Sequence, residues 1–417
     1  MTQRRKKRIL YVNHTGLVSG AERVLVNILR GLNRAEYEAT VLCPRDGNLH
    51  ALVEHEGIAC CAMPQVHARF TWRPDRLLRY AVSLVKTTFA VWKTIRCINP
   101  DIVHANSVRA GIVATIATAG SKRPVIWHVH DILPRHRMSQ AIRLLAYMSR
   151  RTQVIGVSHA TASAFVGSLP FNERARAIHN GIDLDSFPLK KAGSSLFRQE
   201  IGIPDKAFLV CAVGQICARK GLRGLLDAFH RIDQQAPQMH LAFVGKPVFE
   251  HEQQYRDSLT TTAVAYGIED RVYFTGERRD VSAALQAADL VVLNSLDEPF
   301  GLVLIEAMSS GTPVLATRVG GIPEVVHDSQ NGWLIESGDT VGLASKLLEL
   351  SQDRERLARV AHFAHEVTCP QFSIDRFHSK LHAYYAELES QPGARWKAQK
   401  ELVPTGFSTG QGDDFHA

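Results

Sequence analysis

Cysteine and long apolar runs are both scarce in this chain of 417 residues. The seven cysteines are odd in number and form no C-x-x-C pair, which excludes a disulfide-built scaffold and predicts reduced thiols in a cytoplasmic protein. No apolar run approaches the roughly 18 residues that a membrane-spanning helix requires. The basic N-terminus RRKKR precedes only a short apolar stretch, Ile9–Val12, which is typical of a first strand rather than of a signal peptide.

Familiar nucleotide and metal motifs are also missing. No G-x-G-x-x-G follows the first predicted strand and no P-loop occurs, so the sequence supports neither a dinucleotide-dependent enzyme nor a P-loop NTPase. The D-x-D spacing at Asp183–Asp185 lies in a turn-rich stretch and is not interpreted as a clamp for a diphosphate-bound metal. We therefore expect no metal requirement and no cofactor.

Charge is unevenly distributed along the chain. The net charge of +8 combines residues 1–170, with 24 Lys and Arg against 9 Asp and Glu (+15), and the remainder, with 25 against 32 (−7). A basic first half suits an acidic partner such as an anionic lipid surface, a phosphorylated acceptor or a nucleic acid.

Short β-branched runs alternate with longer helical patterns, which predicts parallel sheets covered by helices on both faces. The rhythm stops in a turn-rich stretch around residues 179–195 and then restarts, so two similar halves are expected. The predicted strands of the first half are Ile9–Val12, Ala39–Cys43, Asp101–Ala105, Val125–Val129, Val154–Val157 and Ala175–Ile178. Those of the second half are Phe208–Val213, His240–Val244, Val272–Phe274, Leu290–Leu293, Pro313–Ala316 and Trp333–Ile335.

These patterns predict four segments. Residues 1–187 form a first domain and residues 188–371 a second. Residues 372–390 contain a last helix, and residues 391–417 form a polar, Gly-rich tail that is predicted to be disordered.

A helix predicted over Arg76–Ile98 carries a regular basic face. Its basic residues are Arg76, Arg79, Lys86, Lys93 and Arg96, and its apolar set includes Leu78, Leu84, Val85, Phe89, Trp92 and Ile95. Two interpretations stay open. Either the apolar side packs on a sheet and the basic residues are solvated, or the helix docks on an anionic membrane with its long basic side chains reaching the headgroups.

Two stretches of the second half could bind phosphate. In VGQICARKG, Gly214 and Gly221 allow a close backbone approach, and Arg219 and Lys220 bring positive charge to a helix start. In Asn294–Glu324, backbone amides of Phe300, Gly301 and Leu302 would be free where the next helix begins. Each stretch alone is a weak signal.

Two glutamates stand out in that second stretch. Glu298 lies in the loop, where a carboxylate suits a neutral, hydroxyl-rich group rather than phosphate. Glu306 lies in an almost wholly apolar helix, so a partner is expected: two ribose hydroxyls, as for the acidic residue of dinucleotide folds, or a buried ion pair with an arginine.

The EPFGLVLIE run, with its glutamates eight residues apart, resembles the signature of the retaining glycosyltransferases of family 4. Further motifs match that family in order over roughly residues 8–388: SGAE, DIVHANS, HVHD, GVSHAT, HNGID, VGQICARKGL, FVGK, VYFTGERRDV and GGIPEVV. The resemblance implies a GT-B fold, in which two Rossmann-like α/β domains face each other across a cleft and the last helix crosses back to the first domain.

The resemblance also implies a role for each matching residue. His130, Glu298, Pro299 and Phe300 would contact the donor sugar, with His130, Lys220 and Glu298 as the catalytic set. Gly20, Arg219, Lys220, Phe300, Gly301 and Leu302 would surround the donor diphosphate, and Glu306 would hold the ribose. One position departs from the family, which usually has arginine where this chain has Gln215; a neutral amide supplies no full charge to a diphosphate.

The sequence therefore predicts a retaining glycosyltransferase that moves a sugar from a UDP, GDP or ADP donor to a lipid-linked, lipopolysaccharide or other glycan acceptor at the cytoplasmic face of the membrane. Arg76, Arg79, Lys86 and Lys93 would meet the membrane or acceptor, and no nucleic acid partner is expected. The alternatives are a soluble-sugar or small-molecule acceptor and, in another class, a nucleotide-sugar epimerase or a non-catalytic sugar-binding protein.

Overall fold

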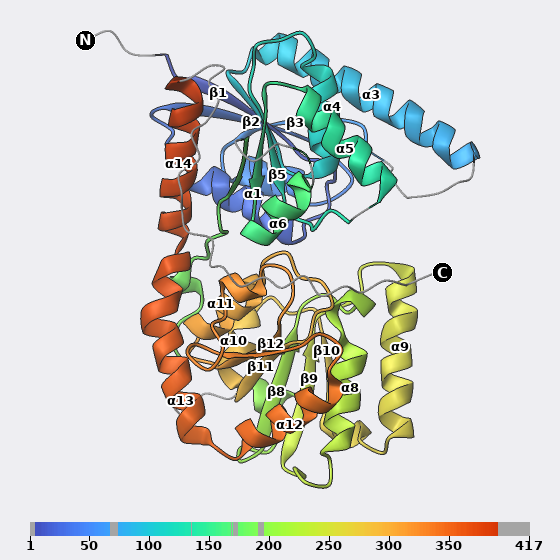
Figure 1. The fold of residues 1–417 in the computed structure, drawn as a ribbon, viewed down its shortest axis with the longest axis vertical. Helices are drawn as coiled ribbons and strands as arrows, with labels where there is room; N and C mark the ends of the chain where they lie inside the picture. Colours follow the sequence, from blue (N-terminus) through green and yellow to red (C-terminus); the bar gives the residue numbers. More distant parts are fainter. Residues whose placement is uncertain are drawn as a thin grey trace.

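The computed structural model describes residues 5–66, 74–134, 136–167, 169, 174–190 and 196–390. Its strands form two separate parallel sheets, one above the other in Figure 1. The predicted class, two α/β domains with helix-flanked parallel sheets, is confirmed. The predicted tail 391–417 and the side chain of Arg76 lie outside the described residues.

The first sheet has seven strands in the order β3-β2-β1-β4-β5-β6-β7, all paired in parallel. The strands are β1 (Lys7–Val12), β2 (Tyr37–Cys43), β3 (Ala59–Ala62), β4 (Ile102–Ala105), β5 (Val125–Val129), β6 (Thr152–Gly156) and β7 (Ala175–Ala177). Sequence patterns missed only β3 in this sheet. Its four residues, ACCA, are half-exposed or exposed and carry no β-branched side chain, so they give no strand signal.

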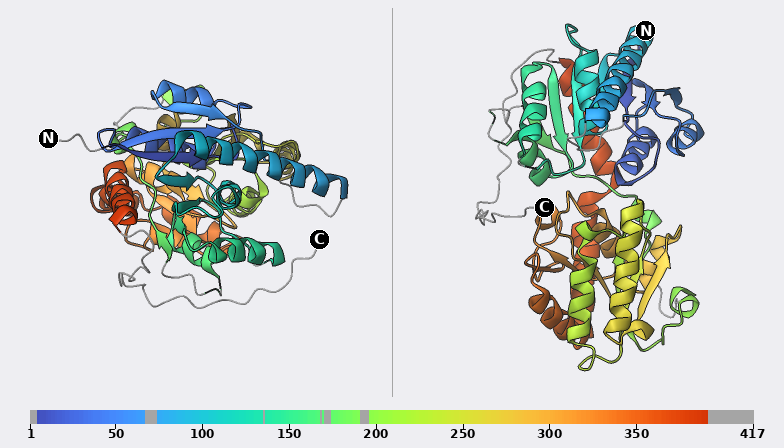
Figure 2. Two further views of the ribbon diagram at one scale, coloured as in Figure 1. Left: turned by 90° about the horizontal axis from the view of Figure 1, so that it is seen from above. Right: turned by 90° about the vertical axis from the view of Figure 1, so that its right-hand side faces the viewer.

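Helices cover both faces of the first sheet (Figures 1 and 2). One face packs against α1 (Gly20–Arg30), α2 (Leu49–His55) and α14 (Ile374–Ser390). The other packs against α3 (Pro74–Ile98), α4 (Val108–Ala117), α5 (Arg137–Met148) and α6 (His159–Val166). Helix α14 comes from the far end of the chain, yet its Tyr385 is fully buried in the first core.

The second sheet has six parallel strands in the order β10-β9-β8-β11-β12-β13. They are β8 (Phe208–Val213), β9 (Met239–Val244), β10 (Val272–Gly276), β11 (Leu290–Leu293), β12 (Val314–Thr317) and β13 (Trp333–Ile335). Its helices are α7 (Leu196–Glu200), α8 (Leu222–Arg231), α9 (Glu250–Ala265), α10 (Val281–Ala287), α11 (Leu302–Ser309), α12 (Thr340–Ser351) and α13 (Arg354–Phe363). Helices α8, α9, α12 and α13 pack on one face, and α7, α10 and α11 on the other.

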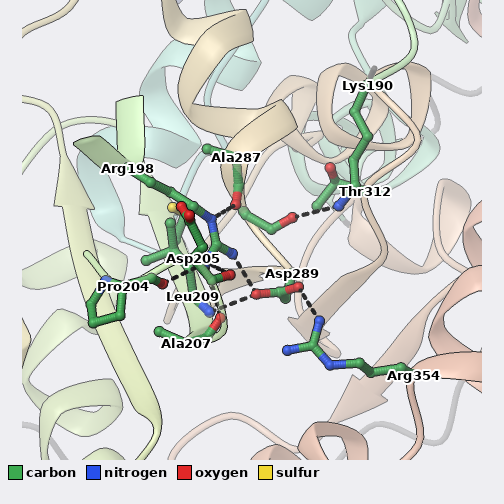
Figure 3. Close-up of polar contacts among 12 residues, drawn as sticks. Lys190, Arg198, Pro204, Asp205, Ala207, Leu209, Ala287, Asp289, Thr312 and Arg354 are labelled. Carbon is green, nitrogen blue, oxygen red and sulfur yellow. Dashed lines mark hydrogen bonds and ion pairs between the residues drawn. The ribbon is translucent and has the colours of Figure 1, made fainter. Parts of the chain in front are cut away.

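A largely buried carboxylate links elements of the second domain where β11 begins (Figure 3). Asp289 accepts hydrogen bonds from Arg198 of α7 at 2.6 Å, Arg354 of α13 at 2.9 Å and the Leu209 amide of β8 at 2.8 Å. Because Asp289 and Arg198 are paired and hydrogen-bonded, the burial of Arg198 and of most of the carboxylate is tolerated, while Arg354 pairs from the exposed side. The network joins helices from both faces to the sheet. The domain boundaries at residues 187 and 371 stay predictions.

Candidate active site

The two sheets meet through loops that follow the carboxyl ends of their strands, which is where open α/β sheets bind ligands. Several contacts join the domains there. Ser158, at the start of α6, donates to the Pro299 carbonyl at 2.6 Å, and a Cβ added at Gly320 would lie 2.8 Å from the side chain of Ile132. Leu302 packs against the cores of both domains.

Lys220 and Glu298, predicted from separate motifs, form an ion pair with an Nζ–Oε2 distance of 2.6 Å. Lys220 ends the short helix η3 (Ala218–Lys220), and the next residue, Gly221, has φ +61. A Cβ at Gly221 would lie 1.9 Å from the carbonyl oxygen of Asn294, so only glycine lets this turn pack against the end of β11. This close approach places the lysine beside the glutamate 78 residues later.

The loop that carries Glu298 is supported from behind by two glycines. The Gly321 amide donates to the Glu298 carbonyl at 2.9 Å, and a Cβ at Gly320 would lie 2.0 Å from that same oxygen. The backbone amides of Phe300, Gly301 and Leu302 make no hydrogen bond within the described part of the chain. Free amides at a helix start attract anions. The buried Phe300 ring stacks on His179 instead of facing a ligand, so this residue offers its amide.

Glu306 has no hydrogen-bond or ion-pair partner among the described residues, so the alternative of a buried ion pair with an arginine is not found among them. Burial raises the pKa of its carboxyl to about 7, and Arg23 of α1, across the domain boundary, opposes that rise from a distance. The Glu306 side chain is half-buried, so part of it remains accessible. An unpaired carboxylate in this position is available to a ligand's hydroxyl groups.

His130 follows β5 on the first-domain side. Its Nε2 lies 3.0 Å from Oδ1 of Asn106, which follows β4. Burial, with the neighbouring His128 and His14, lowers the pKa of His130 well below its usual range, so the ring is neutral at pH 7. The loop beyond it lies near the Glu298 loop, since a Cβ at Gly320 would lie 2.8 Å from Ile132. Burial raises the pKa of Asp297 in that loop, and nearby Asp131 adds to the rise.

Three positions remain: Gln215, where the chain departs from the family, and the predicted diphosphate residues Arg219 and Gly20. Gln215 donates to the Glu252 carboxylate at 2.6 Å. Arg219 is exposed and donates to the Asp297 carbonyl at 2.9 Å, which braces the Glu298 loop. Gly20 opens α1, and its side has open space where a Cβ would point.

Glu324 received no role from the sequence, although its motif GGIPEVV was recognised. From η5 (Ile322–Glu324) it reaches the first domain, accepting from the amides of His159 and Ala160 at 2.8 Å each and lying 2.7 Å from Nε2 of His179. Burial alone would raise its pKa, but these bonds outweigh that effect and lower it. The side chains of His159, His179 and Glu324 lie close enough together to bind a metal ion, and they form the group of this kind found among the described residues. Because both carboxylate oxygens already accept hydrogen bonds, the group is better described as a bridge between domains.

The basic residues predicted to meet a membrane do not join this site. Arg79, Lys86 and Lys93 lie on α3, on the side of the first domain away from the second sheet (Figure 1). Packing of the apolar set against the sheet holds for Ile95 and for half-buried Leu84. It is wrong for Leu78, Val85, Phe89 and Trp92, whose side chains are exposed.

Comparisons with known proteins agree with this architecture. Residues 18–186 match the model of the family described as Glycosyltransferase Family 4, and residues 194–367 match that of Glycosyl transferases group 1. The structure of Anabaena Alr3699/HepE in complex with UDP-glucose aligns with a TM-score of 0.78 and 29% identity, covering 91% of this chain and 100% of that one.

Two relatives of known name carry out different reactions. N-acetyl-alpha-D-glucosaminyl L-malate synthase of Bacillus anthracis is 28% identical over 70% of this chain and 75% of its own length. The lipopolysaccharide core biosynthesis glycosyltransferase LpsD of Rhizobium meliloti is 26% identical over 83% of this chain and 89% of its own.

Two facing parallel sheets with a candidate site between their strand ends define a glycosyltransferase of the GT-B fold. With both family models matched in order, the chain belongs to the group 1, family 4 glycosyltransferases.

Proposed function

We propose that this glycosyltransferase transfers a sugar, with retention of anomeric configuration, from a nucleoside-diphosphate donor to a lipid-linked or lipopolysaccharide-type acceptor at the anionic cytoplasmic face of a membrane. The UDP-glucose complex of the Anabaena protein supports the donor class, and the role of LpsD in lipopolysaccharide core biosynthesis supports the acceptor class. The observation that carries the membrane proposal is the surface of α3.

Helix α3 exposes an apolar stripe that points away from its own domain. Five large apolar side chains recur at helical spacing and are 40–68% exposed: Leu78, Val82, Val85, Phe89 and Trp92. The opposite side of the helix is buried through Ser83, Thr87, Val91 and Ile95. The outer stripe therefore exposes a continuous apolar surface to water, which is unfavourable unless another surface covers it.

The basic residues beside the stripe favour an anionic lipid bilayer as the surface that covers it. Lys86, Lys93 and Arg96 flank it, and no acidic residue occurs between positions 76 and 98. Lys86 and Lys93 make no ion pair within the described residues, while Arg96 lies over the Trp92 ring at 4.8 Å. Exposed aromatic and aliphatic groups bordered by lysine and arginine are the composition of interfacial membrane helices. No helix in the described ranges has the length and hydropathy of a membrane span.

Vesicle sedimentation tests this surface. The protein should sediment with phosphatidylglycerol vesicles at low salt, less at high salt, and hardly at all with phosphatidylcholine vesicles. Removing two lysine charges (Lys86→Gln with Lys93→Gln) should weaken binding about 25-fold, at about 1 kcal/mol for each charge.

The double variant Phe89→Ser with Trp92→Ser should lose binding at both salt concentrations. Val264→Ser with Val341→Ser, which removes two exposed apolar side chains from the second domain, is the matched control and should bind like the wild type. Absence of wild-type binding at either salt concentration would reject the membrane proposal.

In the donor site, Lys220 supports the diphosphate as negative charge grows on it during bond cleavage. The free amides of Phe300, Gly301 and Leu302 add uncharged donors at the same helix start, with Gly20 opposite and Arg219 nearby. Glu306 takes the two ribose hydroxyls. Glu298, held by Lys220, and Pro299 border the sugar from the second domain, and His130 from the first.

Retention is proposed without a covalent enzyme intermediate. A double displacement needs two carboxyl groups about 5 Å apart across the sugar, whereas Glu298 and Glu306 both come from the second domain and Glu298 is paired with Lys220. The sugar's bond to the diphosphate oxygen breaks, the acceptor oxygen bonds to the same anomeric carbon on the same face, and the acceptor proton passes to an oxygen of the leaving diphosphate. The anomeric coupling in the product's NMR spectrum tests retention, and an inverted product would contradict it.

A small soluble acceptor is the second candidate, because the Bacillus anthracis relative is an N-acetyl-alpha-D-glucosaminyl L-malate synthase. Free malate and free sugars, offered beside lipid-linked sugars, separate the two candidates.

A further inference from the structure

A buried chain of polar side chains connects the loop before α1 to His130. The Asn106 amide nitrogen lies 3.0 Å from Asn13 Oδ1, and the Asn13 amide nitrogen lies 3.1 Å from Glu22 Oε1. Asn13 and Asn106 are fully buried and Glu22 is 2% exposed. Buried polar chains of this kind fix the direction of every hydrogen bond once one end is defined.

The Glu22 end of the chain is defined by its donors. The Ser19 amide at 3.0 Å and the Ser19 hydroxyl at 2.6 Å both donate to Oε2, while Asn13 donates to Oε1. Three donors meeting on one carboxyl group match an ionised carboxylate, which only accepts.

Backbone carbonyls fix the orientation of both asparagines independently. Asn13 Nδ2 also donates to the Thr15 carbonyl at 2.7 Å, and Asn106 Nδ2 also donates to the Ala21 carbonyl at 3.1 Å. Flipping either amide would set its oxygen against a carbonyl oxygen. Asn106 Oδ1 is therefore the acceptor that faces His130, and Nε2 of His130 must carry the hydrogen.

We propose that Glu22, Asn13 and Asn106 are positioning residues that hold His130 as the neutral Nε2–H tautomer and leave its Nδ1 lone pair to accept a hydrogen bond from a hydroxyl of the donor sugar. The proposal rests on the sugar-binding role proposed above for His130. Nδ1 makes no hydrogen bond to the described residues, and the ring is half-buried, so a ligand can reach it.

The neighbouring histidines do not set this tautomer. The ring of His128 lies with its centroid 4.3 Å from that of His130, but the hydrogen-bonding contact of His128 runs the other way, from Nδ1 to His104 Nε2 at 3.3 Å. His104 continues to the Tyr385 hydroxyl at 2.7 Å. The polar chain through Asn106 is thus the contact that distinguishes the two ring nitrogens of His130.

Nitrogen NMR of the full chain labelled with ¹⁵N-histidine tests the proposal directly. The signal that disappears in His130→Gln identifies His130, and its two ring nitrogens should show the Nε2–H pattern in the wild type at pH 7. The Nδ1–H pattern in the wild type would overturn the proposal, and this outcome needs neither a folded Asn106 variant nor any activity.

Variants of Asn106 test the cause. Asn106→Leu removes the acceptor, so the Nδ1–H form should appear, and kcat/KM for the nucleotide sugar should fall roughly tenfold, the size of one lost hydrogen bond. Asn106→Asp keeps an oxygen facing Nε2, and its second oxygen must carry a proton because it faces the oxygens of Asn13 and Ala21. In this neutral form it should restore the wild-type NMR pattern and most of kcat/KM per folded molecule. Asn331→Leu removes an equally buried asparagine of the second domain and should change neither quantity per folded molecule.

The same variants separate this proposal from the proposed function. Affinity for the free nucleoside diphosphate should stay unchanged in Asn106→Leu, because only the sugar contact depends on the tautomer. An unchanged NMR pattern together with unchanged kcat/KM in Asn106→Leu would overturn the positioning role. A protein that transfers no sugar but shows the expected NMR patterns would refute the proposed function and leave the tautomer assignment standing.

Discussion

The two sides of the candidate site are built from different chemistry. On the second-domain side lie an ion pair, Lys220–Glu298, and an unpaired carboxyl, Glu306, whose pKa is raised to about 7. On the first-domain side His130 is neutral and is held by buried asparagines. The difference suggests separate roles: the second domain offers charge and free amides to the diphosphate and carboxylates to the hydroxyls of ribose and sugar, while the first domain offers the sugar a neutral histidine.

The largest expected effect comes from removing the cation. Lys220→Ala should lower kcat by about 10² to 10³, the usual cost of losing one group that stabilises transition-state charge. Affinity for the nucleotide sugar should fall less, because the diphosphate's charge increases as the bond breaks. Steady-state kinetics measures both effects, with Lys346→Ala on α12 as the control variant. Unchanged kcat with a raised KM would show that Lys220 serves binding alone.

Glu306→Gln should weaken nucleoside diphosphate binding by about 10- to 100-fold at pH 8, since two charge-assisted hydrogen bonds to ribose are lost. Because the pKa is raised to about 7, the carboxyl is neutral below that pH, and wild-type affinity should rise between pH 6 and 8. Calorimetry across this range should show a smaller rise in Glu306→Gln; parallel curves would remove the ribose assignment.

The stability of the empty protein gives Glu306 an independent check. Its folded pKa lies above the unfolded value of 4.5, so the stability it contributes is present below pH 4.5 and is lost as pH rises through about 7. Wild-type Tm should therefore fall relative to Glu306→Gln between pH 5 and 8. A constant difference in Tm would mean that the carboxyl is not strained by burial.

His130→Ala should sharpen the comparison, because it belongs to the neutral side. We expect kcat/KM for the nucleotide sugar to fall roughly tenfold, as for one neutral hydrogen bond, with affinity for the free nucleoside diphosphate unchanged. Calorimetry with both ligands measures the split. Equal losses for both ligands would place His130 with the nucleotide.

The smallest effect is expected at the position where the chain departs from its family. Gln215→Arg should raise nucleoside diphosphate affinity by about three- to fivefold, from one added charge near the phosphates in partly screened surroundings. Glu252, the present partner of Gln215, limits the gain. Weaker binding on calorimetric titration would show that Gln215 points away from the phosphates.

Much of the fold was predictable because buried parallel strands appear as apolar runs, which can be recognised from the local sequence alone. The predicted strands were found in both sheets, within one or two residues at their ends. The exposed strand β3 escaped because its residues carry no such signal. Pairing of Lys220 with Glu298 depends on the Gly221 turn packing against Asn294, a contact that no local pattern contains.

Two further features depended on the surroundings of a helix rather than on its sequence. The periodicity of α3 shows apolar residues on opposite sides but does not say which side meets the sheet, so the outward stripe of Phe89 and Trp92 appeared only in the structure. Likewise an apolar helix predicts burial for Glu306, yet the helix lies at the domain boundary and leaves the carboxyl half-buried without a partner. Glu324 was missed because its partners, His159 and His179, are brought to it by the other domain.

The most direct test of the whole account is release of nucleoside diphosphate from a panel of UDP-, GDP- and ADP-sugars, with lipid-linked sugars in phosphatidylglycerol vesicles or free sugars and malate as acceptors. The account predicts release with one nucleotide class, only when a lipid-linked acceptor is present, and faster on anionic than on neutral vesicles. Release at the same rate without an acceptor, or with soluble acceptors alone, would contradict it.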